Sequence, residues 1–143
     1  MKLCSTLFLF VITFGFSQKY SKQEMQLFSQ TQKLDSLMQN NDIKILELLE
    51  KDISFGHSNG WVQNFNDFKK DFISKKVHYS KIEQLEILDV KKFKKTFRIR
   101  RKIRVSGWYK NNAFGMNLSL LEIWIKNKSD WKLLSRQSIE IKP

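Results

Sequence analysis

The segment from Asp52 to Trp61 marks the point where the sequence changes from helical periodicity to strand alternation. Within it, Ile53, Phe55 and His57 alternate with small or polar residues. A strand here directs these three side chains to one face, because successive side chains of a strand point to opposite faces. We therefore expect His57 to point toward the core. Helices before this segment and a sheet after it predict an α+β fold.

An Asn-Gly dipeptide at positions 59–60 predicts a tight hairpin turn. These residue types tolerate the positive φ values that both central positions of a type I′ turn require. A two-residue loop of this kind places Ser58 opposite Trp61 and His57 opposite Val62.

Three helices are predicted before the main sheet. The first covers residues 21–39, where apolar residues recur with a period near 3.6. The second follows Asp42, a favourable N-cap, and ends near Lys51. The third begins at an N-cap of Asn64 or Asn66. The positions expected to face the core are Met25, Phe28, Leu34, Leu37 and Met38 in the first helix, Ile45, Leu46 and Leu49 in the second, and Phe65, Phe68, Phe72 and Ile73 in the third.

The rest of the chain alternates as strands do. Residues 77–90, 94–106, 114–126 and 131–141 are expected to be strands, separated by short polar links. Consecutive strands with short links form an antiparallel meander. In the first of them the alternation slips between Tyr79 and Leu85, as a β-bulge would cause. We therefore expect three helices and a short hairpin to pack on a curved four-stranded antiparallel meander.

Residues 1–17 have the features of a secretory signal peptide. A single Lys2 precedes an apolar run at residues 3–16 that is too short to span a bilayer. Gly15 and Ser17 suit the −3 and −1 positions of a cleavage site before Gln18. We expect export to the periplasm or the extracellular space, with an N-terminal membrane anchor as the alternative. Residues 18–143 then form a single domain.

The chain is strongly basic, with 26 Lys and Arg against 14 Asp and Glu and a formal charge of +12. This balance favours anionic neighbours, which include nucleic acid, anionic lipid or polysaccharide, and acidic ligands. Nucleic acid is the least favoured, because an exported protein seldom meets it. The single cysteine, Cys4, lies in the predicted signal peptide and leaves the mature protein without a disulfide. The two histidines lack the spacing of a metal site, and no cofactor is predicted.

This order of elements resembles the nuclear-transport-factor-2-like superfamily, the cone-shaped fold shared by ketosteroid isomerase, scytalone dehydratase and SnoaL-like polyketide cyclases. The resemblance covers residues 21–141. The strings Phe-Gly-His-Ser-Asn-Gly at 55–60, Ile-Trp-Ile-Lys at 123–126 and Trp-Lys-Leu-Leu-Ser-Arg-Gln at 131–137 are similar to the branch described as domain-of-unknown-function family 4440. Such a fold does not by itself decide the function.

The resemblance implies a pocket between the helices and the sheet. We expect it to bind a small ligand, which the basic composition allows to be anionic. The alternative is an isomerase or dehydratase with His57 as its acid–base residue, because residues 53–58 correspond to the strand that carries the base of ketosteroid isomerases. The residues expected to line the pocket are Phe55, His57, Phe68, Tyr79, Arg101, Trp124 and Arg136.

His57 and Arg101 are the two strongest candidates for functional residues in this pocket. A neutral imidazole can take or give a proton near pH 7, although a core histidine with one hydrogen-bond partner is the simpler interpretation. Arg101 interrupts an apolar strand face, and a buried guanidinium must be paired. Its partner is expected to be Glu122 or a bound anion.

The opposite face of the strand at 94–106 carries a row of cations. We call it the basic row, and it consists of Lys94, Arg98, Arg100, Lys102 and Arg104. The simplest interpretation is a solvated sheet face. An anionic surface or polymer is a second, and a homodimer that places Glu83 and Glu86 against the row is a third.

Overall fold

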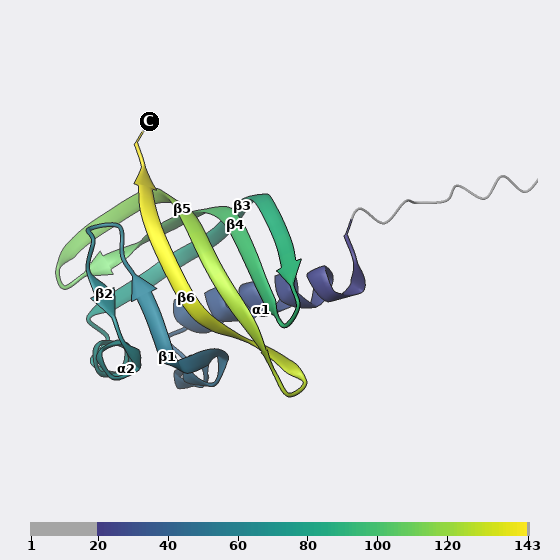
Figure 1. Cartoon of the computed structure of the whole chain (residues 1–143). Helices are drawn as coiled ribbons and strands as arrows, with labels where there is room; N and C mark the ends of the chain where they lie inside the picture. Colours follow the sequence, from purple (N-terminus) through teal and green to yellow (C-terminus); the bar gives the residue numbers. More distant parts are fainter. Residues whose placement is uncertain (1–19, 143) are drawn as a thin grey trace, which may run out of the picture.

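The computed structural model describes residues 20–142, so the predicted signal peptide lies outside the described residues. Within this range, helices cover one side of a strongly curved six-stranded sheet (Figure 1). The helical elements are α1 (Lys22–Gln39), the 3-10 helix η1 (Ile43–Leu48) and α2 (Phe65–Ile73). The strands are β1 (Leu49–Gly56), β2 (Val62–Gln63), β3 (Val77–Phe93), β4 (Thr96–Tyr109), β5 (Asn112–Asn127) and β6 (Asp130–Ile141). None of these helices is long and apolar enough to cross a membrane.

The sheet is mixed, with the strand order β2-β1-β6-β5-β4-β3. Strands β3 to β6 form the antiparallel meander that the sequence predicts. The predicted total of four strands was wrong, because β1 pairs in parallel with β6 and β2 pairs antiparallel with β1. Parallel pairing joins segments far apart in the chain, so local alternation does not reveal it.

The predicted helix after Asp42 was also wrong in type and length. Asp42 does cap it, because its carboxylate accepts the Lys44 N–H at 3.0 Å. The helix is however a short 3-10 segment, and β1 begins at Leu49. Leu49 is 2% exposed and lies opposite Leu133 of β6, so strand pairing prevails over the helical pattern.

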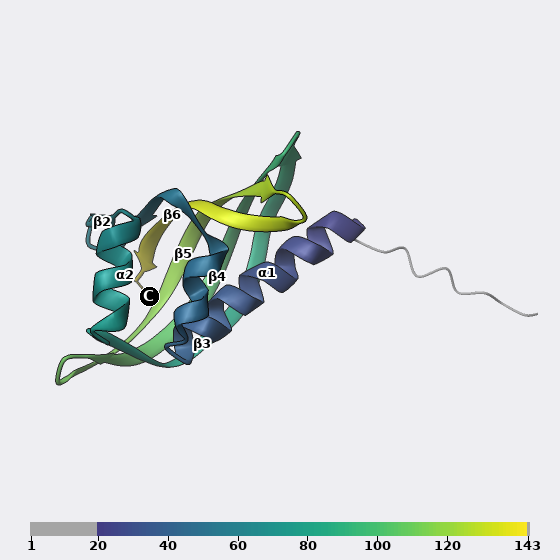
Figure 2. The same ribbon diagram turned by 90° about the horizontal axis from the view of Figure 1, so that it is seen from below.

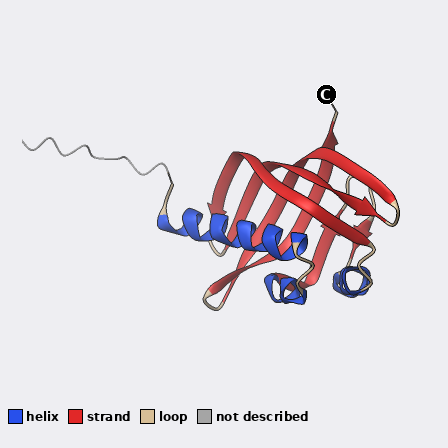
Figure 3. Cartoon of the chain, turned by 180° about the vertical axis from the view of Figure 1, so that it is seen from behind, coloured by secondary structure: helices blue, strands red, loops and turns tan. Residues whose placement is uncertain are grey.

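Helix α1 lies across the concave face of the sheet, and α2 covers the end beside β1 and β2 (Figures 2 and 3). A capping box between Ser21 and Glu24 begins α1, and the Asn64 side chain caps α2. The expected core positions Met25 and Ile73 are exposed instead, at 47% and 56%. Met25 precedes the fully buried Leu27 by two residues, which places it about 200° around the helix.

The β1–β2 hairpin turns one residue earlier than predicted. Gly56 pairs with Val62, and the His57 N–H donates to the Trp61 carbonyl at 2.8 Å. Gly60 has a positive φ of 87°, whereas Asn59 does not. The loop therefore has three residues with a left-handed glycine, and the type I′ prediction was wrong. The Asn59 side chain favours this turn by accepting the Trp61 N–H at 3.0 Å.

Strand β3 bends as the sequence predicts. Its register with β4 shifts between Tyr79 and Lys81 and again between Gln84 and Glu86, in the region where the alternation slips. The β3–β4 turn corrects another boundary, because Lys94 lies in that turn with a φ of 51° and not in a strand.

Candidate functional site

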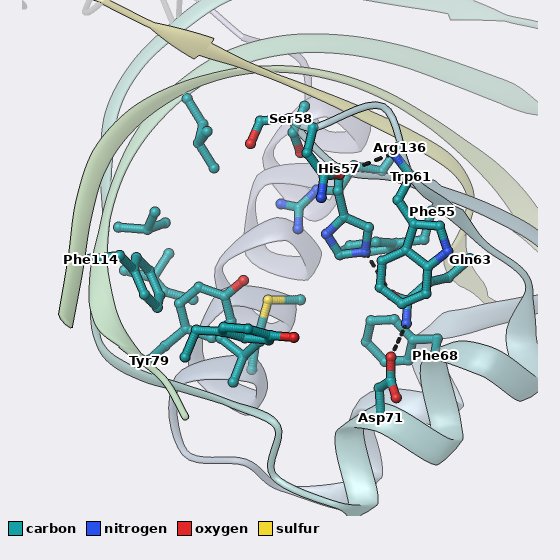
Figure 4. Close-up of a pocket in the computed structure, with 18 of the residues that line it drawn as sticks. Phe55, His57, Ser58, Trp61, Gln63, Phe68, Asp71, Tyr79, Phe114 and Arg136 are labelled. Atoms are coloured by element: carbon teal, nitrogen blue, oxygen red, sulfur yellow. Dashed lines mark hydrogen bonds between the residues drawn. The ribbon is translucent and has the colours of Figure 1, made fainter. Parts of the chain in front are cut away.

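A cavity of about 440 Å³ lies between α1, α2, the β1–β2 hairpin and the concave face of the meander. Its volume is typical of small-molecule sites, which measure about 300–1,000 Å³. Figure 4 shows the hairpin and α2 on one side of the cavity, with Tyr79 and Phe114 across from them. Much of the sheet wall is apolar, and it includes Ile103, Val105, Phe114, Met116 and Leu118.

The structure brings most of the predicted pocket residues together. Five of them line the cavity, namely Phe55, His57, Phe68, Tyr79 and Arg136. Arg101 and Trp124 are fully buried and are not among the lining residues. His78 is exposed and does not line the cavity.

The ring of His57 is held by aromatic neighbours. It stacks on Trp61 with a centroid distance of 5.1 Å and an interplanar angle of 17°. Phe55 lies 5.4 Å from the same ring and 4.9 Å from Phe68. These contacts restrict the imidazole to one orientation at the cavity wall.

The polar edge of His57 belongs to a chain of hydrogen bonds that ends on α2. Nε2 of His57 lies 2.7 Å from Oε1 of Gln63. Nε2 of Gln63 donates to Oδ2 of Asp71 at 3.0 Å, and Nζ of Lys76 donates to Oδ1 of Asp71 at 3.3 Å. Gln63 is only 3% exposed, so both ends of its amide are satisfied within the protein.

Burial shifts the pKa values of two cavity side chains in the direction that favours their uncharged forms. Burial lowers the pKa of His57 below 6.5, an effect that Gln63 opposes and Arg136 reinforces. Burial also raises the pKa of Tyr79 above 10.0, and Arg136 opposes that effect. At neutral pH the cavity therefore holds a neutral imidazole and a protonated phenol.

Behind the cavity lies a buried ion-pair network. Arg101 donates to Glu122 at 3.0 and 3.2 Å, so the predicted pair between them is confirmed. It also donates to Asp35 of α1, with Nη2 and Oδ1 2.8 Å apart, a partner that the sequence did not predict. Burial alone would raise the pKa of Glu122, but Arg101 and Arg136 outweigh it and hold the pKa at about 2. With a further hydrogen bond to Oε1 of Gln84 at 3.0 Å, the donors of Arg101 are all taken by protein acceptors.

Arg136 connects this network to the cavity. Its Nε donates to Oε1 of Glu122 at 2.9 Å, and its guanidinium carbon lies 5.2 Å from the Phe55 ring centroid. Its Nη2 is 2.8 Å from the same Glu122 oxygen but makes no aligned hydrogen bond. Arg136 is 4% exposed and lines the cavity, and its Nη1 makes no hydrogen bond among the described residues.

Sequence reasoning missed several cavity residues. Gln63 and Asp71 gave no signal, because their roles depend on the corrected hairpin register and on the placement of α2. Ile103 and Val105 could have been found, because they share strand parity with Arg101. Among the described residues, no group of three His, Cys, Asp or Glu side chains could hold a metal ion.

The basic row lies on the opposite face of β4. Arg98 pairs with Asp89 at 2.7 Å and Lys102 with Glu86 at 3.1 Å. Arg104 is 3.9 Å from Glu83, whereas Arg100 is exposed and makes no ion pair among the described residues. The acids of β3 thus offset much of the row within the chain.

Solved structures share this architecture. An NTF2-like protein from Cytophaga hutchinsonii is 19% identical, with a TM-score of 0.77 over 85% of this chain and 100% of that chain. An NTF2-like protein from Rhodospirillum rubrum is 21% identical, with a TM-score of 0.76 over 81% and 98%. A protein from Novosphingobium aromaticivorans, provisionally named a scytalone dehydratase, is 11% identical, with a TM-score of 0.72 over 84% and 85%.

These likenesses show that the chain has the nuclear-transport-factor-2-like fold, as the sequence resemblance implied. At such identities they show the fold alone. No family model matches the chain, and a search of curated proteins finds no match either.

Proposed function

We propose that the cavity binds a small, largely apolar ligand whose polar group meets His57 and Arg136. The observation that carries this proposal is a cavity of about 440 Å³ whose apolar sheet wall lies across from the polar side chains of His57, Gln63 and Asp71 (Figure 4). Apolar walls supply affinity through burial, and a few converging polar groups orient the ligand.

The state of the polar groups supports the same proposal. Arg136 lines the cavity, and no hydrogen bond of its Nη1 occurs among the described residues. A ligand acceptor would supply a partner for this donor. The protonated Tyr79 hydroxyl offers a further donor, and no hydrogen bond of this hydroxyl occurs among the described residues.

A matched pair of substitutions on β5 tests the cavity. Leu118 lines it, whereas the side chain of its neighbour Ser119 points to the other face of the sheet. Leu118→Trp should fill the cavity and weaken binding of 2-naphthol, used as an apolar probe with one hydroxyl, by about tenfold or more. Ser119→Trp adds the same indole outside and should leave the affinity within about twofold. Affinities are measured by NMR titration of the full chain.

The result is informative only for folded variants, so each variant is first checked by its amide spectrum. Equal weakening by both substitutions, or no binding by the wild type at millimolar probe, would remove the support for a ligand cavity.

We also infer that the chain is exported and belongs to the family 4440 branch. Support for export is the apolar run before Gln18, and support for the branch is the set of strings at 55–60, 123–126 and 131–137.

Acid–base catalysis at His57 is the alternative function. It is favoured by the lowered pKa of His57, which keeps the imidazole neutral and able to accept a proton.

A further inference from the structure

Three polar side chains connect α2 to the cavity through the hairpin. We call these three residues, Asp71, Gln63 and His57, the relay. The outer contact is supported by Lys76, which pairs with Asp71 at 3.3 Å. The inner end is the ring of His57, held between Trp61 and Phe55.

The relay determines which nitrogen of His57 carries the proton. The Asp71 carboxylate only accepts hydrogen bonds, so Gln63 must turn its NH₂ group toward it. The amide oxygen of Gln63 then faces Nε2 of His57 at 2.7 Å, and this nitrogen must be the donor. In the neutral imidazole Nδ1 is therefore an acceptor. Figure 4 shows the ring nitrogen of His57 that is not bonded to Gln63 directed toward the middle of the cavity.

The charges around the cavity balance. Asp35 and Asp71 are its acidic lining residues, and Lys76 and Arg136 are its basic ones. Lys76 pairs with Asp71, and Arg136 lies 3.7 Å from Asp35. A charged ligand would lose its hydration here without gaining a free counter-charge. An uncharged ligand is favoured, despite the basic composition of the chain.

We propose that Asp71 and Gln63 are positioning residues that hold His57 as the hydrogen-bond acceptor for a hydroxyl or N–H group of an uncharged ligand. This inference rests on the proposed function for its ligand, but the positioning part concerns the protein alone. Two experiments separate these parts.

The first experiment determines the tautomer of His57 without a ligand. The chain has two histidines, so long-range proton–nitrogen NMR spectra of the labelled full chain at pH 7.5 resolve each ring. We expect an unprotonated Nδ1 and a protonated Nε2 for His57. Asp71→Asn allows the Gln63 amide to turn either way and should produce a mixture of tautomers. Asp67→Asn, an exposed site one turn earlier on α2, should not.

A protonated Nδ1 in the wild type would overturn the positioning role. The same conclusion would follow if Asp71→Asn left the tautomer unchanged. If the Asp71 variant does not fold, a protonated Nδ1 in the wild-type spectrum still overturns the positioning role.

The second experiment compares three probes of similar size by NMR titration. They are 2-naphthol, its methyl ether and 2-naphthoate. We expect 2-naphthol to bind about tenfold more tightly than either of the others, because only it is an uncharged donor for Nδ1. This preference over the ether should decrease in Asp71→Asn, because only part of its His57 rings then offers an acceptor Nδ1.

The preference should also disappear as the pH falls through the lowered pKa of His57, because an imidazolium has no acceptor nitrogen. The groups that face the ring are Arg136, Asp71, Gln63, Trp61 and Phe55. Equal binding of naphthol and ether, or tighter binding of naphthoate, would overturn the ligand class. If no probe binds, the proposed function fails, whereas the tautomer still decides the positioning role.

Discussion

At the scale of single residues, Arg101 shows how a charge is placed in the core of this fold. It is fully buried, and its donors are taken by Asp35, Glu122 and Gln84. Burial would lower the pKa of Arg101, but the two carboxylates outweigh burial and raise the pKa above its usual value. A buried pair of this kind is sensitive to the loss of one member, because the remaining charges stay in a poorly solvated place.

We predict that Arg101→Met lowers the free energy of unfolding by about 3–5 kcal/mol. Lys102→Met is the matched control, because Lys102 is adjacent, partly exposed and paired with Glu86, and its loss should cost at most about 1 kcal/mol. Urea denaturation measures both values, and similar losses for the two variants would contradict the prediction.

The same network predicts the acid stability of the wild type. The folded-state pKa of Glu122, about 2, is below its unfolded value of 4.5. Its contribution is therefore complete above pH 4.5 and lost as the pH falls toward 2. Urea denaturation between these pH values should show decreasing stability.

At the scale of elements, the bend of β3 over β4 shapes the cavity wall that carries Tyr79. Tyr79 lies opposite Gly107, next to the first register shift. A Cβ atom on Gly107 would lie 2.1 Å from the carbonyl oxygen of His78, a backbone atom. The two strands approach this closely only because residue 107 has no side chain.

We predict that Gly107→Ala destabilises the protein by about 1–3 kcal/mol, as overpacking does. Gly115→Ala on β5 is its control, because a Cβ there meets nothing within 4 Å, and it should change stability by less than about 0.5 kcal/mol. Thermal unfolding of both variants checks this, and an unchanged melting temperature for Gly107→Ala would show that the strands can separate at no cost.

At the scale of the whole molecule, the formal charge of +12 is not concentrated in the cavity. The cavity is balanced, and the basic row is offset by acids of β3. Binding of the row to an anionic surface stays a prediction, as does a dimer through this face.

We predict that replacing Arg98, Arg100, Lys102 and Arg104 by Gln reduces retention on heparin and its dependence on salt. Neutral replacements avoid new acids beside Glu83 and Glu86. The control replaces Lys33, Lys44, Lys69 and Lys142 by Gln. These lysines are exposed on other parts of the chain, and their replacement lowers the net charge by the same amount. Equal retention of the two variants would assign the effect to total charge, and a dimer burying the row in the wild type would also contradict surface binding.

Much of the local structure was predictable from the sequence. The caps at Asp42 and Asn64, the antiparallel meander and the bulges of β3 were confirmed. The inward direction of His57 was also predictable, because the alternation of Ile53 and Phe55 in β1 continues for one residue beyond the end of the strand at Gly56. Each of these features depends on residues within a few positions of one another.

Tertiary structure decided the rest. Asp35 pairs with Arg101 across 66 residues, β1 pairs in parallel with the distant strand β6, and Gln63 meets Asp71 because α2 packs beside the hairpin. A one-residue change in a turn also altered which side chain faces His57. Such contacts depend on where distant elements pack. The local pattern of polar and apolar residues does not identify these partners, because the same pattern is compatible with several arrangements of the elements. The sequence by itself therefore determined that Arg101 needs an anionic partner and that His57 faces inward, and the packed fold decided which groups bind them.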